Sequence, residues 1–326
     1  MFLLRIFKDA RGTGGAALML LSVLLFLPSF LHPEVHPETT GMPLYSLMFG
    51  WLHDHPFFNQ LFCLLHVWVL LYVLIQINGR HQLTEFRTFM PGTFFLLMAA
   101  ALPMEQIVTP ELTGMVFVAI SFVVLLEQNE SKRSLSRVFS ASLILAAGSL
   151  FYLPLFWFIP LVWISLVTLA PVTWREIAVP LVAYACLAIF LISWYWGVQD
   201  APDQLRSILQ TNMTRPEKAG PYHLSIYLYY AYLFFLVILA SFHMIQRFQS
   251  RKTFIQNIYQ VFFYMFVAGL LFFWLLARFQ PQGLLLLAMP SSILLPHYFH
   301  RRKNHWSHEL MLWVLAGLLV FAQLRT

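Results

Sequence analysis

The chain has 326 residues, of which 60% are hydrophobic, 17% are aromatic and only 10% are charged. A soluble domain carries about 25% charged residues, so this composition excludes a soluble protein and requires lipid as the surrounding solvent. The net charge of +6 does not indicate nucleic-acid binding, because the basic residues lie between apolar runs and form no patch. Cys63 and Cys186 both fall inside apolar runs, so we expect neither a disulfide nor a metal site.

The first apolar run follows a basic start. Arg5, Lys8 and Arg11 precede residues 15–31, an order that resembles the basic and apolar parts of a signal peptide. No small-x-small cleavage site follows and many further apolar runs do, which favours an uncleaved first helix. We expect its basic flank to stay in the cytoplasm.

The apolar runs predict an all-α polytopic membrane helix bundle, because no strand alternation of the barrel type is present. About eleven spans fit them, at residues 15–31, 59–77, 90–103, 113–126, 138–152, 156–169, 177–196, 223–244, 258–276, 283–299 and 310–323. The expected location is a bacterial inner membrane, with the N-terminus in the cytoplasm and the C-terminus in the periplasm. Basic residues favour this orientation, because all Lys and Arg fall in segments assigned to the cytoplasm except Arg206, Arg215, Lys218, Arg278 and Arg325.

Two long polar segments interrupt the single membrane domain that we expect over residues 1–326. The first outer loop, residues 32–60, carries Glu34, Glu38 and Asp54 and no Lys or Arg. Helical spacing between residues 42 and 53 predicts a helix on the membrane surface. If the protein performs chemistry, we expect its acids in this loop, and the alternative is an ordinary solvated connection. Residues 197–222 are predicted to form the second long outer loop.

Several predicted spans are shorter than the roughly 20 residues that a bilayer needs, and Pro and Gly lie near their ends. Two interpretations remain open, a cavity that faces the outside or tight turns between tilted helices. No inverted repeat is visible and intramembrane charges are nearly absent, which argues against a transporter. We interpret His66, within the second span, as a packed and hydrogen-bonded side chain rather than a ligand.

Three stretches near the middle of the chain resemble an uncharacterised Bacteroidota family of multipass integral membrane proteins. They are Phe151-Tyr152-Leu153-Pro154, the apolar run to Leu169, and Trp174-Arg175-Glu176. Members of that family are similar in length to this chain. The resemblance implies a membrane location and brings no established activity.

The plan of the chain is also similar to the GT-C superfamily of membrane glycosyltransferases. Those enzymes have an acidic first outer loop with a surface helix, like residues 32–60 with PLYSLMFGWLHDH. A second outer acid follows a short third span, as Glu105 or Glu111 would here. An Arg precedes a Pro-containing late span, as Arg278 precedes LLLLAMPSSILLP. The chain departs from the superfamily where Glu34 replaces the common Asp, and where the paired acids of the first loop are missing.

The GT-C resemblance implies transfer of a sugar from a polyprenyl-phosphate carrier at the outer face of the membrane. No cofactor besides this donor is required, and the need for a divalent cation stays undetermined. The resemblance assigns proton transfer to a carboxylate, in order of preference Glu34, Glu38 and Asp54. It assigns the departing phosphate to arginines, namely Arg278, Arg206 and Arg215. The acid that steers the acceptor or an ion would be Glu105 or Glu111.

The competing hypothesis is a protein without catalytic activity. Such a chain would be a scaffold or accessory subunit of an envelope assembly, or of a lipid or polysaccharide export system. Aromatic residues at the ends of the predicted spans favour membrane lipid as a partner under either hypothesis.

Overall fold

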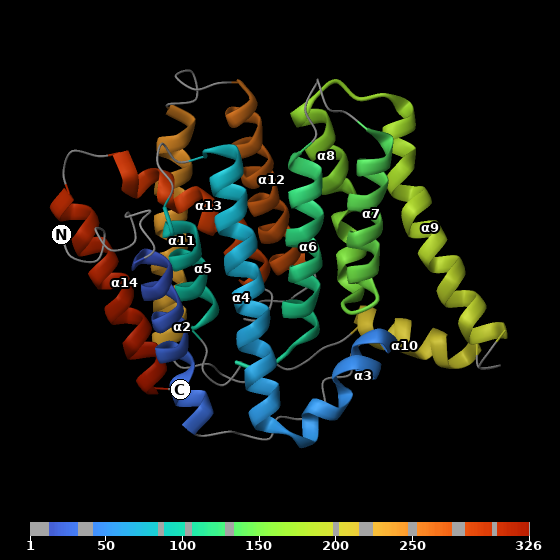
Figure 1. Ribbon diagram of the computed structural model, residues 1–326, viewed down its shortest axis with the longest axis horizontal. Coiled ribbons are helices and arrows are strands. Elements are labelled where there is room, and N and C mark those ends of the chain that lie inside the picture. The colour runs from blue at the N-terminus through green and yellow to red at the C-terminus, as the bar shows by residue number, and fades with distance from the viewer. Residues whose placement is uncertain are drawn as a thin grey trace. The chain divides into compact units, whose positions relative to one another are not determined.

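The computed structural model describes residues 13–31, 42–83, 88–101, 106–127, 134–197, 202–214, 224–246, 253–275, 284–301 and 305–325. Over these residues the chain forms helices joined by turns, and no strand (Figure 1). The predicted all-α class is therefore confirmed.

Each predicted span overlaps one helix, except residues 156–169, which overlap both η3 and α8. Three further elements, α3, η1 and α10, fall in the segments predicted as outer loops. The bounds are α2 Thr13–Leu31, α3 Pro43–Phe49, η1 Gly50–Asp54, α4 Pro56–His81, α5 Met90–Ala99, α6 Pro110–Leu126, α7 Leu135–Ser149, η3 Leu153–Phe158, α8 Ile159–Leu169, α9 Trp174–Gly197, α10 Pro202–Thr214, α11 Leu224–Gln246, α12 Thr253–Leu275, α13 Leu284–Arg301 and α14 His305–Arg325.

Six of the described helices are long and apolar enough to cross a membrane, namely α2, α4, α9, α11, α12 and α14. The apolar helices α5, α6, α7 and α13, and the segment of η3 and α8, are shorter. Short spans are tolerated where neighbouring helices cover their ends. These lengths and compositions make the chain a multipass membrane protein.

Four helices, α4, α6, α7 and α9, begin three residues earlier than predicted, and side-chain hydrogen bonds at the start of α6 and α9 explain two of these differences. Thr109 caps α6, and its Oγ1 accepts a hydrogen bond from the backbone N–H of Leu112 at 3.1 Å. Thr173 precedes α9, and its N–H and hydroxyl donate to Glu176 Oε2 at 2.7 and 2.8 Å. Trp174, Arg175 and Glu176 therefore belong to the first turn of α9, before the predicted start at residue 177.

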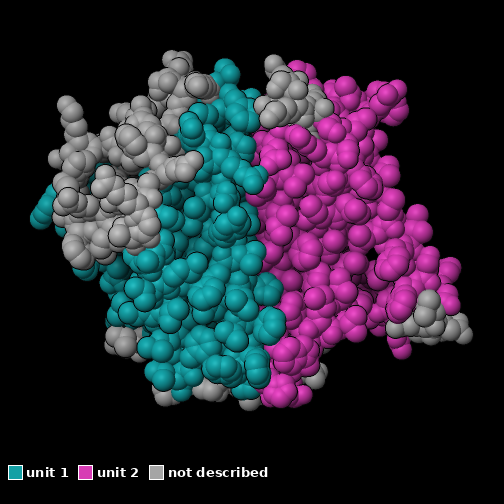
Figure 2. All heavy atoms as spheres, viewed as in Figure 1, with its two compact units in different colours: residues 1–34, 56–107, 219–326 teal, residues 35–55, 108–218 magenta. Residues whose placement is uncertain are grey.

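The chain divides into two compact units (Figure 2). Unit 1 contains Met1–Glu34, Pro56–Ile107 and Ala219–Thr326, and unit 2 contains Val35–His55 and Val108–Lys218. Each unit has its own packed helices, so we describe each by itself.

In unit 1 the short helix α5 is enclosed by α2, α4 and α13, and α13 also packs on α11 and α12. Nearly every residue of α5 is buried. Gly92 permits the close approach of α2, because a Cβ at Gly92 would lie 2.9 Å from Leu18 Cδ2. The Tyr229 hydroxyl donates to the Leu97 carbonyl at 2.7 Å. Apolar packing and side-chain hydrogen bonds thus hold α5 in the centre of this unit.

The C-terminal end of α4 is followed by a residue with a left-handed backbone conformation. Gln82 has φ of 49°, and the N–H of Leu83 donates back to the Asn78 carbonyl at 3.3 Å. This bond pattern is a Schellman closure, in which glycine normally takes the left-handed position. The Tyr259 hydroxyl donates to the Leu83 carbonyl at 2.7 Å and fixes the turn.

We expect Gln82→Gly to stabilise unit 1 by up to about 1 kcal/mol, because glycine adopts a positive φ without a Cβ clash. Gln82→Ala keeps the Cβ and should leave the stability unchanged, which makes it the matched control. The measurement is the free energy of unfolding in mixed micelles titrated with a denaturing detergent. A loss of stability in Gln82→Gly would contradict this explanation.

In unit 2, α7 packs between α6 and α9, while η3 packs against α7, α8 and α10. Leu155 of η3 is fully buried. A Cβ at either Gly114 of α6 or Gly148 of α7 would lie 3.0 Å from Leu155 Cδ1. The Phe117 and Phe151 rings stack with their centroids 5.0 Å apart. Small residues on α6 and α7 thus make room for the turn that joins α7 to α8.

Candidate active site

The structure describes three of the candidate site residues, Asp54, Glu111 and Arg206, and all three belong to unit 2. The other candidates lie outside the described residues, namely Glu34, Glu38, Glu105, Arg215 and Arg278.

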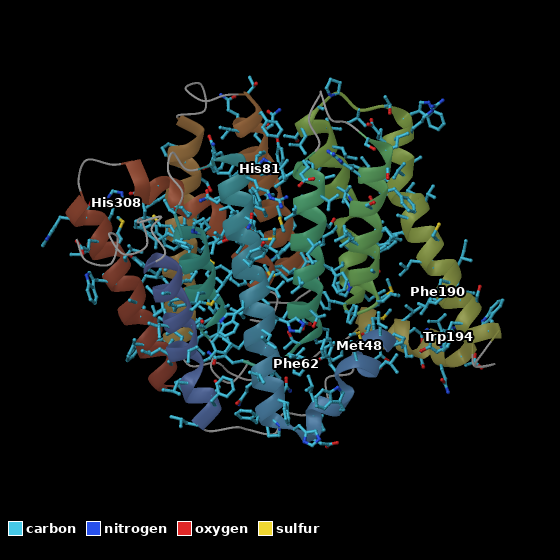
Figure 3. The ribbon with its side chains drawn as sticks, in the orientation of Figure 1. Met48, Phe62, His81, Phe190, Trp194 and His308 are labelled. Carbon is cyan, nitrogen blue, oxygen red and sulfur yellow. The ribbon has the colours of Figure 1, made fainter. Side chains whose placement is uncertain are left out.

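The helix predicted between residues 42 and 53 is present as α3 followed by η1. The Tyr45 hydroxyl donates to the Val108 carbonyl at 2.7 Å, and the Phe49 ring lies 6.3 Å from the Phe151 ring. These contacts fix the buried side of α3 to the segment before α6 and to the residues before η3. Its other side exposes apolar Leu47 and Met48 (Figure 3). Such an apolar exposed face is expected of a helix beside lipid.

Glu111 lies in the first turn of α6 and is only 8% exposed. The positive end of the helix dipole favours a carboxylate at this position. The N-terminal cap of α6 is provided by Thr109, whose Oγ1 accepts a hydrogen bond from the N–H of Leu112. Because Val108 accepts the Tyr45 hydroxyl, the start of α6 and the helix α3 adjoin. Unit 2 therefore carries a buried acid three residues after Val108, which the Tyr45 hydroxyl of α3 contacts.

Asp54 is exposed as the last residue of η1. The structure places it on the predicted loop helix, and no described hydrogen bond joins it to Glu111. Of these two acids, Glu111 is buried and Asp54 is exposed.

Arg206 lies on α10, a helix that the sequence analysis did not predict within residues 197–222. The helix packs on α9 and η3 through buried Leu205, while Arg206 is exposed. Pro202 at its start and the apolar spacing of Leu205, Ile208 and Leu209 are the signals that predict such a helix. An exposed guanidinium in this place is able to bond a phosphate oxygen pair.

Aromatic side chains accompany α3 and α10 at the same end of unit 2, which lies at the bottom of Figure 1. Phe190 and Trp194 project from the last turns of α9, near α10 (Figure 3). Trp157 of η3 is also exposed. Exposed rings at helix ends are typical of the boundary between lipid and water. The buried acid and the exposed Arg206 therefore both belong to an end of unit 2 with the character of a membrane boundary.

Within the described residues, no three His, Cys, Asp or Glu side chains gather in a way that could hold a metal ion. His66 was interpreted as hydrogen-bonded, and its Nδ1 lies 2.7 Å from the Phe62 carbonyl. That bond makes Nδ1 the donor and leaves His66 within the helix packing of α4.

The helices and their ends define a class, the multipass α-helical membrane proteins. Within this class, residues 47–326 match a family of unknown function, DUF6427, and the chain belongs to that family. Comparisons with curated proteins and with solved structures found no match.

Proposed function

We propose that the chain is a GT-C-like glycosyltransferase of the bacterial inner membrane, in a family of the Bacteroidota. It takes a sugar from a polyprenyl-phosphate carrier at the outer face, with its N-terminus in the cytoplasm and its C-terminus in the periplasm. The single observation that supports this proposal best is the burial of Glu111 beside the surface helix α3. Burying a carboxylate that is only 8% exposed is costly unless polar groups compensate for it, so Glu111 lies where it can hold a polar group in a defined orientation.

In the proposed reaction, an acceptor hydroxyl attacks the anomeric carbon of the sugar. The bond between this carbon and the phosphate oxygen breaks, and a bond to the acceptor oxygen forms. Glu34 accepts the proton of the hydroxyl, with Glu38 and Asp54 as the next choices. Arg206, Arg215 and Arg278 bind the phosphate that leaves on the polyprenyl chain. Glu111 orients the acceptor hydroxyl, a role that Glu105 could share.

We expect Glu111→Gln to lower the rate of sugar transfer by about 10²-fold, because an uncharged amide holds a hydroxyl less firmly than a carboxylate does. The assay uses proteoliposomes that contain polyprenyl-phosphate sugars, with released polyprenyl phosphate measured by mass spectrometry. Asp203→Asn is the control, since Asp203 is an exposed acid of α10 with no assigned role. Asp203→Asn should retain full activity.

The same assay separates the two hypotheses. Wild-type protein that is folded and releases no polyprenyl phosphate from any donor would contradict the proposed transfer, and would favour a scaffold or accessory subunit of an envelope assembly. Equal rates for wild type and Glu111→Gln would remove Glu111 from the reaction.

A further inference from the structure

A buried group of polar side chains surrounds the C-terminal end of α5 in unit 1. The Ala100 carbonyl accepts a hydrogen bond from Gln323 Nε2 at 2.8 Å and a long one from Gln106 Nε2 at 3.4 Å. Gln106 Nε2 also lies 3.4 Å from the Leu25 carbonyl, and Gln106 Oε1 accepts the Ser29 hydroxyl at 2.7 Å. Because α5 ends among other helices, these side chains replace the water that would bond its last carbonyl.

A further buried amide, Gln60, lies near the start of α4. Gln60 and Asn78 lie five helical turns apart and so share one side of α4. Asn78 Nδ2 donates to the Thr88 carbonyl just before α5, and a Cβ at Gly92 would lie 3.4 Å from Leu71 Cδ2. This side of α4 is therefore the side that packs on α5.

The level of Gln60 follows from the same helix geometry. Because a Cβ at Gly92 would contact Leu71, these two residues mark one level on the two helices. From this level, Gln60 lies about 16 Å away along α4, and Ala100 lies about 12 Å away along α5. Since α4 and α5 run in opposite directions (Figure 1), Gln60 lies roughly one turn beyond the end of α5. This helix geometry places Gln60 at about the level of Gln106 and the Ala100 carbonyl.

Gln60 has an unsatisfied acceptor in this region. The residue is 3% exposed, and its Oε1 has no hydrogen-bond partner among the described residues. Gln106 Nε2 is a donor whose two bonds, both at 3.4 Å, are longer than ordinary N–H···O bonds. Within the part of the chain that the structure describes, Gln60 Oε1 lacks a donor, and Gln106 Nε2 is only weakly bonded. A ligand group that donates to the first and accepts from the second would satisfy both. A hydroxyl does so without charge.

We propose that Gln60 and Gln106 form a binding site for a hydroxyl group of a neutral sugar ring. The assignment to a sugar, rather than to water, rests on the proposed glycosyltransferase function. The hydroxyl donates to Gln60 Oε1 and accepts from Gln106 Nε2, while Ser29 and Gln323 keep the surrounding amide and carbonyl groups in place. The site discriminates against phosphate and metal ions, because none of its side chains carries a charge. These side chains are Gln60, Gln106, Gln323 and Ser29.

The test measures binding of methyl glycosides, the soluble probes of a sugar ring, to the full chain in nanodiscs by saturation-transfer NMR. We expect wild type to bind at least one methyl glycoside, and Gln60→Leu to weaken that binding at least tenfold. Gln204→Leu makes the same chemical change at an exposed position of α10 and should bind as wild type does. The melting temperature of Gln60→Leu should equal or exceed that of wild type, because an apolar side chain removes an unsatisfied acceptor.

Two results would overturn the sugar site. They are the absence of glycoside binding to folded wild type, and equal binding by wild type and Gln60→Leu, which would mean that Gln60 bonds only water. Gln60→Met provides a second variant of similar length if Gln60→Leu does not fold. Failure of the proposed function would give a different result. Glycoside binding would still depend on Gln60, but no polyprenyl phosphate would be released from a lipid-linked donor.

Discussion

Replacing Glu34 by Gln should lower the rate of sugar transfer by at least about 10²-fold while the protein stays folded. Glutamine has nearly the shape of glutamate but cannot accept a proton, and removing a general base costs about 10²- to 10⁴-fold in rate. Glu34 lies outside the described residues, so this prediction rests on its place in the acidic first loop and on the GT-C resemblance. The measurement is the initial rate of polyprenyl-phosphate release in proteoliposomes.

A pH profile distinguishes loss of the base from loss of binding. A missing base lowers the maximal rate and changes the acidic limb of the profile, whereas weaker binding raises KM alone. Glu38→Gln is the matched variant from the same loop and should have the smaller effect. A folded Glu34→Gln variant with full activity would transfer the role to Glu38 or Asp54.

Gly148→Ala should destabilise unit 2 by about 1–3 kcal/mol, the usual cost of extra volume in a packed core. A Cβ at this position would lie 2.7 Å from Phe117 Cβ and 3.0 Å from Leu155 Cδ1. Both neighbours are held in place, since Leu155 is fully buried and Phe117 stacks on Phe151. The helices α6 and α7 must therefore separate to accept the methyl group. Detergent-induced unfolding in mixed micelles measures the loss.

The control for this prediction is Gly317→Ala in α14, where an added Cβ would meet no atom within 4 Å. Alanine favours a helix over glycine by about 1 kcal/mol, so this variant should be neutral or slightly more stable. Equal destabilisation of Gly148→Ala and Gly317→Ala would show that close packing at Gly148 does not determine the stability of unit 2.

Hydropathy predicted where the apolar helices lie, because a helix that crosses lipid must be apolar over most of its length regardless of its neighbours. The exact helix starts needed local chemistry that hydropathy does not report. Thr109 and Thr173 each extend a helix by one turn through side-chain hydrogen bonds. Both threonines are recognisable capping residues, so closer attention to caps would have corrected these boundaries.

The helices α3 and α10, which lie in the predicted outer loops, differ in how clearly the sequence indicated them. The apolar spacing before Asp54 predicted α3, whereas the charged residues around Arg206 concealed the apolar stripe of α10. Leu205 shows why the stripe exists, since it is buried where α10 packs on α9 and η3. A charge-rich segment can thus still form a helix when one side of it has a partner.

The properties of the candidate site depended most on tertiary structure. The sequence identified Glu111 as an acid near a span, but its burial follows from tertiary packing around the start of α6, which no local pattern predicts. The amides Gln60 and Gln106 were not singled out, because an isolated glutamine in an apolar run gives no signal of its own. Their relation arises from the end of α5 within the bundle and from the bond between Ser29 and Gln106.

The most direct test of the proposed function is the amount of polyprenyl-phosphate-linked sugar in cells with and without this chain. We predict that deletion makes one such lipid accumulate, that wild type restores its normal level, and that Glu34→Gln does not. Mass spectrometry of lipid extracts measures all three. Unchanged levels of every polyprenyl-phosphate-linked sugar in the deletion strain would contradict the proposed transfer.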